Sequence, residues 1–369
     1  MIEASRLAVA LIQASISDFR QAFLEILIER LGDDFDAYAG AVYFDGTTRT
    51  RVQIGSRLHS LGNHFLFGRR LLWQSGAVSA ALRPDVVILE YNPRILSVWV
   101  SLLLRRIRRR RSLLWGHAWS RRGAGSWTNR VRSLMRWFAD GLIVYTDEQA
   151  RDIASNWPTR PLFVAPNSMY RRDQLQPVDG SGGNDFLYVG RLAASKRPIL
   201  LLEAFGKAID RLPADSRLVF VGEGPLDLEL HELAATVPAG RVVFEGHVAD
   251  PERLRAMYAR SLMSVSPGPV GLSVTQSLGF GIPMIIARDE PHGPEVVAAV
   301  EGFNAEFFAP STAEALADCL VEAASEPGTW RARSAAISEA CRTKYSAEAM
   351  ADGFVTAIQA MGGLRRPLS

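Results

Sequence analysis

The sequence is poor in cysteine and contains no hydrophobic segment long enough to cross a bilayer. Two cysteines in 369 residues cannot build a disulfide framework, so we expect both thiols to be reduced and the chain to lie in the cytoplasm. No run of about 18 uncharged apolar residues is present, and residues 1–6 lack the layout of a signal peptide. Apolar residues make up 48% and charged residues 22%, which excludes a disordered or low-complexity chain.

Acidic residues and lysine are missing from one long stretch, called here the basic zone. Residues 91–139 contain twelve arginines but no Asp, Glu or Lys, whereas the whole chain carries a net charge of only +3. Outside this zone 30 basic residues stand against 39 acidic ones. The basic zone predicts an anionic partner, and lipid headgroups, phosphates and nucleic acid all have that chemistry.

What the sequence does contain is a repeated alternation of short apolar runs and amphipathic segments. We expect strands at residues 7–12, 39–44, 85–90, 112–117, 141–145 and 161–167, with helices at 19–31, 95–107 and 129–138. The alternation restarts with strands at 186–189, 217–221, 241–244, 262–265 and 283–286, with helices at 198–211, 250–259, 312–324 and 329–345. Repeated βα units predict an α/β fold of two doubly wound parallel-sheet domains, whose ligands bind at the carboxyl ends of the strands.

A Gly-, Ser- and Asp-rich stretch at residues 178–185 separates the two halves and is typical of a linker. At roughly 150 residues per domain, the length also predicts about two domains. We therefore expect one domain at residues 1–167, a linker at 168–185, a second domain at 186–345, and a helix with a basic tail at 346–369.

The segment after the predicted strand at 186–189 has the chemistry of an anion site. Gly190 lets the backbone approach a ligand closely, and Arg191 and Lys196 precede a helix whose N-terminus favours negative charge. Two cations at this spacing can converge on one diphosphate. The alternative is a pair of solvated loop residues.

Further strand ends carry glycine-rich turns or helix starts of the same kind. The N–H groups of Gly271 and Leu272 open a helix, where they suit a phosphate, and Gln276 lies about one turn further, where its amide can hydrogen-bond a ribose. The backbone after the strand at 241–244 can bind the edge of a nucleobase. The candidate ligand-binding residues are Gly190, Gly222, Gly224, His247, Val248, Pro269, Val270, Gly271, Leu272 and Gln276.

This order of motifs resembles the GT-B glycosyltransferases, in particular the large retaining family 4, the glycosyl transferases group 1. That family has, in order, G-R-L-x-x-x-K, V-G-x-G-P, G-x-V and E-G-F-G-L-x-x-x-E-A-x-A-x-G-x-P, and the resemblance covers roughly residues 185–325. The first half matches more loosely, through Gly116–His117 and residues 139–141 and 164–167. The resemblance implies two Rossmann-like domains facing a cleft, with a helix from about residue 347 to 361 that crosses back to the first domain.

The resemblance also implies a mechanism in which His117, Arg191 and Lys196 are catalytic. Arg191 and Lys196 would stabilise the departing diphosphate, which itself accepts the acceptor's proton, so that the anomeric configuration is retained. The donor would be a UDP- or GDP-linked sugar. Neither a cofactor nor a metal is expected, because fixed cations and helix dipoles carry the diphosphate charge. For His117 a structural role is the alternative.

The chain departs from the family pattern at the two glutamates, which fall on Gly268 and Gln276. The residue that normally contacts the donor sugar is therefore missing, and an inactive protein is one interpretation. A subset of bacterial polysaccharide glycosyltransferases has a similar segment followed by His-Gly-Pro-Glu, here residues 292–295. This likeness implies that the backbone of residues 269–272 and the side chain of Glu295 contact the sugar instead.

The first domain is implied to bind the acceptor. Residues 13–20 stand where many family members have a Gly-Gly loop, so we expect an acceptor loop of different construction. Asp34 and Asp36 form a D-x-D, the metal signature of another glycosyltransferase fold, which we interpret as surface charge. The candidate acceptor residues are Phe19, Arg20, Glu90, Asn92 and Arg94.

The basic zone combines an apolar segment, interleaved tryptophans and an arginine run, which suits an anionic membrane surface. Each cation near anionic lipid is worth about 1 kcal/mol. A buried helix with a solvated basic end is the alternative, and nucleic acid is not expected because no recognition motif accompanies the arginines. The candidate membrane residues are Arg105, Arg106, Arg108, Arg109, Arg110 and Arg111.

We therefore expect a retaining glycosyltransferase that moves a sugar from a nucleotide-diphosphate sugar to a membrane-associated acceptor. The acceptor would be a glycolipid or lipid-linked oligosaccharide of cell-surface polysaccharide synthesis, reached from the inner face of the cytoplasmic membrane. One alternative is another GT-B enzyme, such as a nucleotide-sugar epimerase or hydrolase. The other is a non-catalytic module that binds sugar or membrane.

Overall fold

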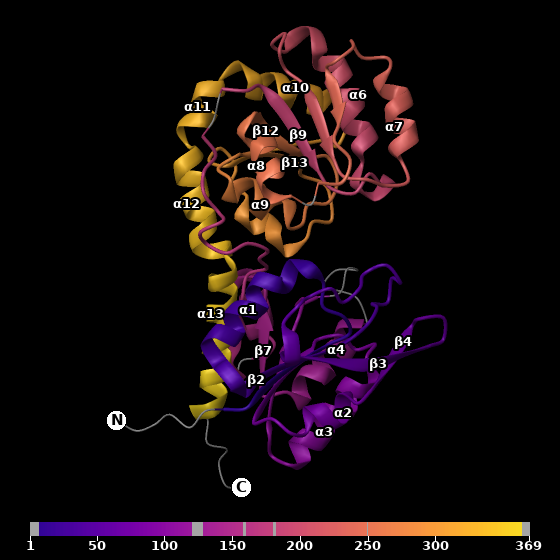
Figure 1. Ribbon diagram of the computed structural model, residues 1–369, viewed down its shortest axis with the longest axis vertical. Helices are drawn as coiled ribbons and strands as arrows, with labels where there is room; N and C mark the ends of the chain where they lie inside the picture. Colours follow the sequence, from indigo (N-terminus) through magenta and orange to yellow (C-terminus); the bar gives the residue numbers. More distant parts are fainter. Residues whose placement is uncertain (1–6, 120–127, 158–159, 180–181, 249, 364–369) are drawn as a thin grey trace. The chain divides into compact units, whose positions relative to one another are not determined.

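The computed structural model describes residues 7–119, 128–157, 160–179, 182–248 and 250–363, and the chain forms two compact units (Figure 1). The first unit combines Met1–Arg171 with Ala347–Ser369, and the second unit is Arg172–Ser346. Each unit has a sheet with helices on both faces, so the predicted α/β class with two doubly wound domains is confirmed. Residues 180–181 of the predicted linker, the N-terminus at 1–6, residues 120–127 of the basic zone and the basic tail at 364–369 lie outside the described residues.

Most of the stretch expected to be a linker belongs to the second unit. The N–H of Val178 donates to the carbonyl of Phe280 at 3.0 Å, and the Val178 side chain is buried. Arg331 donates to the carbonyl oxygens of Gly182 and Gly183 at 2.8 and 2.9 Å. These bonds attach Val178, Gly182 and Gly183 to the second unit, on both sides of the two undescribed positions.

The first unit has an eight-stranded sheet. Its strands are β1 (Val9–Gln13), β2 (Phe35–Gly40), β3 (Leu58–Leu66), β4 (Leu71–Ser75), β5 (Val86–Glu90), β6 (Arg111–Trp115), β7 (Gly141–Val144) and β8 (Leu162–Val164). They lie in the order β4-β3-β2-β1-β5-β6-β7-β8, and all neighbours are parallel except β3 and β4, which form an antiparallel hairpin. The strand predicted at 39–44 is wrong: β2 ends at Gly40, and Asp45 then accepts hydrogen bonds from the N–H groups of Thr47 and Thr48, which turn the chain back.

Helices cover both faces of this sheet (Figure 1). One face carries α1 (Gln21–Leu31) and α13 (Ala347–Gly363), and the other carries α2 (Ala77–Ala81), α3 (Leu96–Ile107), α4 (Thr128–Phe138) and α5 (Asp147–Ala154). On the first face the ring centroid of Phe354 lies 4.7 Å from that of Phe23 and 5.0 Å from that of Trp115. The last helix of the chain therefore completes the core of the first unit.

The second unit has six parallel strands, which are β9 (Asp185–Val189), β10 (Leu218–Val221), β11 (Val242–Phe244), β12 (Ser261–Ser266), β13 (Met284–Ala287) and β14 (Ala305–Phe308). Their order is β11-β10-β9-β12-β13-β14. One face carries α6 (Pro198–Ala208), α7 (Asp227–Ala234) and α10 (Ala313–Ser325), and the other carries α8 (Pro251–Ala259), α9 (Ser273–Gly279) and α12 (Ser334–Tyr345).

Shorter elements connect these layers. The single helix predicted at 329–345 is two helices, α11 (Pro327–Ala332) and α12, which meet at Arg333. The 3-10 helices are η1 (Asp18–Arg20), η2 (Gly32–Asp34), η3 (Gly55–Arg57), η4 (Ala194–Lys196), η5 (Ile209–Arg211) and η6 (Pro294–Ala298). Within the described parts of the chain, no helix is both long enough and apolar enough to cross a membrane.

Candidate functional site

The loops at the carboxyl ends of β9, β10 and β11 are joined through their backbones. The N–H of Gly190 donates to the carbonyl of Val221 at 2.9 Å, and the N–H of Gly222 donates to the carbonyl of Gly246 at 2.8 Å. An added Cβ at Gly222 would lie 1.9 Å from the Gly190 oxygen, and one at Gly224 would lie 2.2 Å from the Leu192 oxygen. The predicted glycines therefore lie together at the carboxyl ends of these strands, and at Gly222 and Gly224 the neighbouring backbone leaves no room for a side chain.

The two predicted cations lie beside these glycines. Arg191 is exposed after β9, and Lys196 is half-buried at the end of η4, immediately before α6. Lys196 Nζ donates to the carbonyl oxygen of Pro269. Lys196 therefore lies against the loop that follows β12, and its contact with a diphosphate stays a prediction.

Residues 268–272 form this loop, called here the β12–α9 loop. An added Cβ at Gly268 would lie 2.8 Å from the backbone carbon of Lys196. The chain therefore has no space for a glutamate side chain at the position where the family pattern has one. The loop leads into α9, whose cap residue Leu272 provides no side-chain cap, so the predicted anion site at Gly271 and Leu272 is made of backbone.

Two predicted side chains near this loop are more enclosed than expected. Gln276 is buried, and its Oε1 accepts a hydrogen bond from the hydroxyl of buried Tyr258 at 3.1 Å. Its ribose contact stays a prediction. Glu295 is buried in η6. By contrast, His247 is exposed and Val248 is half-buried after β11.

The sequence reasoning missed the side chain that anchors the β12–α9 loop. The N–H of Val270 donates to Nδ1 of His292 at 3.1 Å, and the N–H of Gly293 donates to the carbonyl of Val270 at 2.8 Å. Burial lowers the pKa of His292 below its ordinary value. The signal in the sequence was the His-Gly-Pro-Glu segment, of which only Glu295 was assigned a role.

In the first unit, the carboxyl group of half-buried Glu90 joins the carboxyl ends of β1 and β5. Glu90 accepts hydrogen bonds from the N–H of Ala14 at 2.9 Å, from the hydroxyl of Tyr43 at 3.1 Å and from Nδ2 of Asn92 at 3.0 Å. Burial raises the pKa of Glu90, and the nearby Glu90 carboxylate raises the pKa of Tyr43. Glu90 and Asn92 therefore lie together and anchor the surrounding loops, and their contact with an acceptor stays a prediction.

The other predicted acceptor residues are held separately. Arg94 Nε donates to the carbonyl of Arg70 at 2.8 Å, and its guanidinium lies 3.9 Å from the centroid of the Phe44 ring. Arg20 is only 8% exposed, and its guanidinium lies 4.8 Å from the ring centroid of half-buried Phe19 and 4.9 Å from that of Trp115. The structure thus places Arg94 against the β3–β4 hairpin and the guanidinium of Arg20 beside two aromatic rings.

His117 is exposed at the carboxyl end of β6, as its predicted role requires. Its ring centroid lies 4.8 Å from that of Tyr145. Arg132 Nη1 donates to the carbonyl of His117 at 3.0 Å and to that of Tyr91 at 3.1 Å. These bonds fix the backbone that carries His117.

Arg105 was predicted to contact membrane, and that prediction is wrong. The side chain is fully buried, and it donates to Ser112 Oγ at 3.1 Å, to the carbonyl of Pro84 at 2.9 Å and to that of Asp85 at 2.9 Å. Burial lowers the pKa of Arg105 to about 10. In the rest of the run, Arg108 and Arg109 are exposed, whereas Arg106, Arg110 and Arg111 are half-buried.

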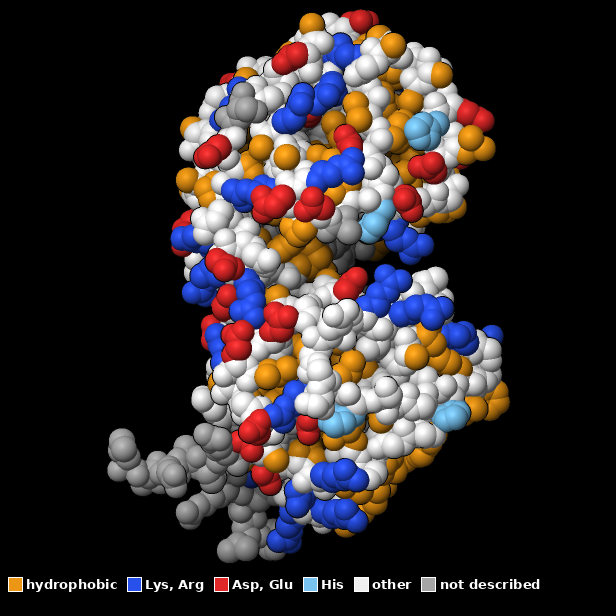
Figure 2. Space-filling model, in the orientation of Figure 1, with side chains coloured by type: hydrophobic (Ala, Val, Ile, Leu, Met, Phe, Trp, Pro, Cys, Tyr) orange, Lys and Arg blue, Asp and Glu red, His pale blue; other side chains and the backbone are white. Residues whose placement is uncertain are grey.

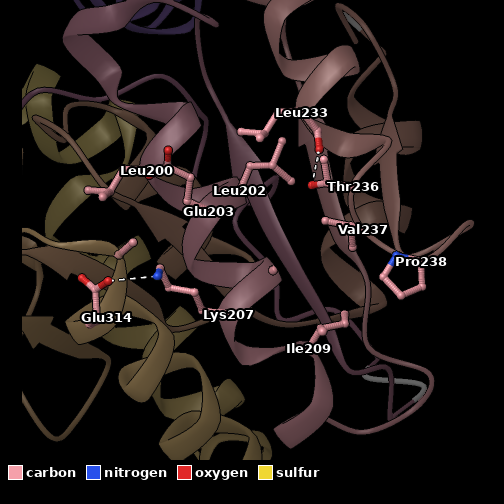
Figure 3. Close-up of a pocket in the computed structure, with 12 residues that line it drawn as sticks. Leu200, Leu202, Glu203, Lys207, Ile209, Leu233, Thr236, Val237, Pro238 and Glu314 are labelled. Carbon is pink, nitrogen blue, oxygen red and sulfur yellow. Dashed lines mark hydrogen bonds and ion pairs between the residues drawn. The ribbon is translucent and has the colours of Figure 1, made fainter.

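A pocket of about 660 Å³ lies elsewhere on the second unit, between α6, α7 and the start of α10 (Figure 3). Lys207 and Glu314 form an ion pair of 3.0 Å at its rim. None of the predicted site residues lines it. Across the described ranges, no group of three or more His, Cys, Asp or Glu side chains is arranged to hold a metal. Asp36 of the D-x-D lies in β2 and binds His59 at 3.0 Å.

Residues 172–342 match the model of a family described as "Glycosyl transferases group 1". Over 189 residues the chain is 29% identical to a GDP-mannose-dependent alpha-(1-6)-phosphatidylinositol dimannoside mannosyltransferase of Mycobacterium tuberculosis. That alignment covers 49% of this chain and 47% of the relative, so the chain spans about half the length of the curated relatives it matches.

Solved structures resemble the chain over nearly its full length. The Anabaena protein HepE in complex with UDP has a TM-score of 0.69 at 16% identity, with 95% of this chain and 99% of that chain covered. Sucrose-phosphate synthase from Thermosynechococcus elongatus has a TM-score of 0.66 at 18% identity, with 96% and 98% covered. At such identities the likeness establishes the fold.

Proposed function

We propose that this protein transfers a sugar from a nucleotide-diphosphate sugar, because residues 172–342 match the model of the glycosyl transferases group 1 and the two units have the GT-B fold. The observation that carries the proposal is the convergence of the loops after β9, β10 and β12, where Lys196 contacts the loop that opens α9. UDP in the HepE structure and GDP-mannose in the name of the mycobacterial relative support these two nucleotides as donor carriers.

The proposed chemistry places the charge of the leaving group on fixed cations and backbone. Arg191 and Lys196 bind the diphosphate, together with the N–H groups of Gly271 and Leu272. They stabilise the negative charge that grows as the glycosidic bond breaks. The diphosphate then accepts the acceptor's proton, and the sugar is transferred with retention. His117 contacts the donor sugar or the acceptor from the first unit.

Arg191→Ala tests the donor site. A lost charge-assisted hydrogen bond costs about 1.5–3 kcal/mol, so affinity for UDP or GDP should fall by about 10- to 100-fold. Arg211→Ala is the matched control, because Arg211 is an exposed arginine of the same unit that pairs with Asp318 in α10. Calorimetric titration measures both variants. An Arg191→Ala protein that binds either nucleotide like the wild type would contradict the assignment.

We further propose that the acceptor is a membrane glycolipid and that the exposed face of α3 and α4 contacts the lipid. Val100, Leu103 and Ile107 recur every three or four residues on α3 and are exposed, as are Leu134 and Trp137 on α4. The guanidinium of Arg106 lies 4.5 Å from the Trp137 ring centroid, which ties the two helices together. Figure 2 shows basic and hydrophobic side chains side by side at the end of the first unit that carries α3.

This face combines the two attractions that hold a protein at an anionic bilayer. Arg108 and Arg109 supply exposed positive charge at the end of α3, next to the apolar residue Ile107. The mycobacterial relative, named for a phosphatidylinositol dimannoside acceptor, supports a lipid-borne substrate. A location at the inner face of the cytoplasmic membrane follows from the proposed donor and acceptor.

The double variant Ile107→Ser, Trp137→Ser tests the membrane proposal. Loss of about 1.5 kcal/mol from even one large apolar side chain lowers binding about tenfold. Leu228→Ser is the matched control, because Leu228 is 72% exposed on α7 of the second unit. Cosedimentation with phosphatidylglycerol vesicles and with phosphatidylcholine vesicles measures the effect. Equal pelleting of the double variant and the Leu228→Ser control would refute the proposal.

A non-catalytic sugar-binding module is the second candidate, and the packing of Gly268 against Lys196 favours it, because that packing leaves no room for the glutamate of the family pattern. A radiolabelled nucleotide sugar separates the alternatives. Labelled glycolipid identifies a transferase, whereas free sugar or its epimer without acceptor identifies another GT-B enzyme. Binding without any product identifies the module.

A further inference from the structure

His292 and its neighbour Gly293 bind both polar backbone groups of Val270 in the β12–α9 loop. Nδ1 of His292 accepts the hydrogen bond from the N–H of Val270, and Nε2 lies 2.7 Å from the carbonyl oxygen of Ala287. Because Nδ1 acts as the acceptor, the ring proton is on Nε2, which donates to Ala287. The N–H of Gly293 binds the carbonyl of Val270 at 2.8 Å. His292 thus links the end of β13 to the start of α9.

We propose that neutral His292 is the positioning residue of the donor site: it holds the β12–α9 loop in the conformation that receives the diphosphate, and its protonation releases the loop and weakens donor binding. This inference rests on the proposed function, because the same loop presents the N–H groups of Gly271 and Leu272. His292 itself touches Val270 and Ala287, so it acts through the backbone.

Only one protonation state of the ring supports these bonds. An imidazolium has no acceptor at Nδ1, so the N–H of Val270 would face another N–H. The charged groups around His292 act in opposite directions: Glu290 on the same segment favours the imidazolium, whereas Lys196 of η4 disfavours it. Arg197 is paired with Glu290 at 3.0 Å. Burial outweighs the attraction of Glu290 and keeps the pKa of His292 below about 6.5.

The expected pH dependence follows from linkage. A group that must be neutral for binding leaves affinity unchanged above its pKa. Below the pKa the apparent dissociation constant rises about tenfold for each pH unit. Because the pKa of His292 lies below its ordinary value, the loss should fall in the range under pH 6.5 and be absent at pH 7.5.

Two variants separate the acceptor role from the ring. In His292→Asn the side-chain oxygen can still accept the hydrogen bond from Val270, and it does not titrate. In His292→Phe the ring remains without a nitrogen atom. Calorimetric titration of GDP-mannose and of UDP-glucose from pH 5 to pH 8 measures the affinities. Nucleotide sugars are used because the terminal phosphate of a free nucleotide would itself titrate near pH 6.

We expect His292→Asn to bind within about threefold of the wild type at pH 7.5 and to lose the steep decrease in acid. His292→Phe should bind up to about tenfold more weakly at pH 7.5, the cost of one hydrogen bond. Nitrogen-15 NMR of the unliganded wild type should show the ring proton on Nε2 and a pKa below 6.5. A ring protonated on Nδ1, or an Asn variant that keeps the acid loss, would overturn the role of His292. A wild type that binds neither nucleotide sugar at any pH would instead refute the donor site.

Discussion

Gly268→Ala tests the close packing of the β12–α9 loop against η4. The added Cβ would lie 2.8 Å from the backbone carbon of Lys196 and 2.9 Å from its backbone oxygen, and main-chain atoms cannot rotate away. Overpacking of this kind costs about 1–3 kcal/mol. For a domain the size of the second unit, each kcal/mol lowers the melting temperature by about 2–4 °C, so the unit should melt about 2–12 °C lower.

Gly271→Ala is the matched control for this prediction. It makes the same change three positions away in the same loop, but its Cβ would meet no atom within 4 Å. Its effect should stay within about 0.5 kcal/mol, or about 2 °C. Gly268→Glu, which restores the glutamate of the family pattern, has the same Cβ and should melt at least as low as Gly268→Ala without gaining activity. Scanning calorimetry of the three variants decides the matter, and equal melting temperatures for the two alanine variants would refute the packing argument.

Other groups lead to predictions about stability and reactivity. Arg105→Met leaves several buried acceptors unpaired and should lower the free energy of unfolding by about 3 kcal/mol or more. Arg109→Ser is the control, because Arg109 is exposed, and it should change the free energy of unfolding by less than about 0.5 kcal/mol. Urea denaturation measures both variants. Burial raises the pKa of Glu90, so the stability it contributes is complete below about pH 4.5 and is lost as the pH rises through the raised pKa. Glu90→Gln should flatten this dependence in denaturation curves between pH 4 and pH 8, and an unchanged slope would contradict the assignment. Burial raises the pKa of the Cys319 and Cys341 thiols to about 12, so mass spectrometry should find neither alkylated by iodoacetamide at pH 8 until the protein is unfolded.

The fold and the family were predictable because buried parallel strands form continuous apolar runs that end in glycine-rich turns. The runs at residues 85–90 and 217–221 correspond to β5 and β10, and the motifs between residues 185 and 325 led to the GT-B fold and to the family whose model matches residues 172–342. The order of the motifs along the chain carried this information, since each motif alone is short.

The β3–β4 hairpin could not be predicted because polar side chains share its inner face with the buried residues Leu61 and Leu72. Asn63 and Gln74 point inward, where Gln74 Nε2 donates to Asn63 Oδ1 at 2.9 Å and Asn63 Nδ2 donates to the carbonyls of Ala14 and Val42. Leu66 and Trp73 are instead exposed. A pattern search for apolar residues on the inner face therefore finds no strand here.

The arginine run misled the sequence reasoning for a related reason. Arg105 continues the buried face of α3 that passes through Val98, Ser101 and Leu102, and this spacing was visible in the sequence. The positive charge of the run was given more weight than this helical spacing, although buried carbonyl groups can accept the hydrogen bonds that a guanidinium donates. The contact between Val270 and His292 lay beyond sequence reasoning, because it depends on the three-dimensional approach of two loops 22 residues apart.

The position of α13 has a consequence for how the protein is made. Residues 7–171 leave the ribosome without the helix that covers Phe23 and Trp115, and the whole second unit is synthesised before that helix exists. The second unit is continuous in sequence and can fold first, while the first unit must keep an apolar face exposed until Phe354 emerges. The first unit is therefore the later of the two to mature, although it is encoded earlier, and a premature stop before Ala347 would leave it with an open core.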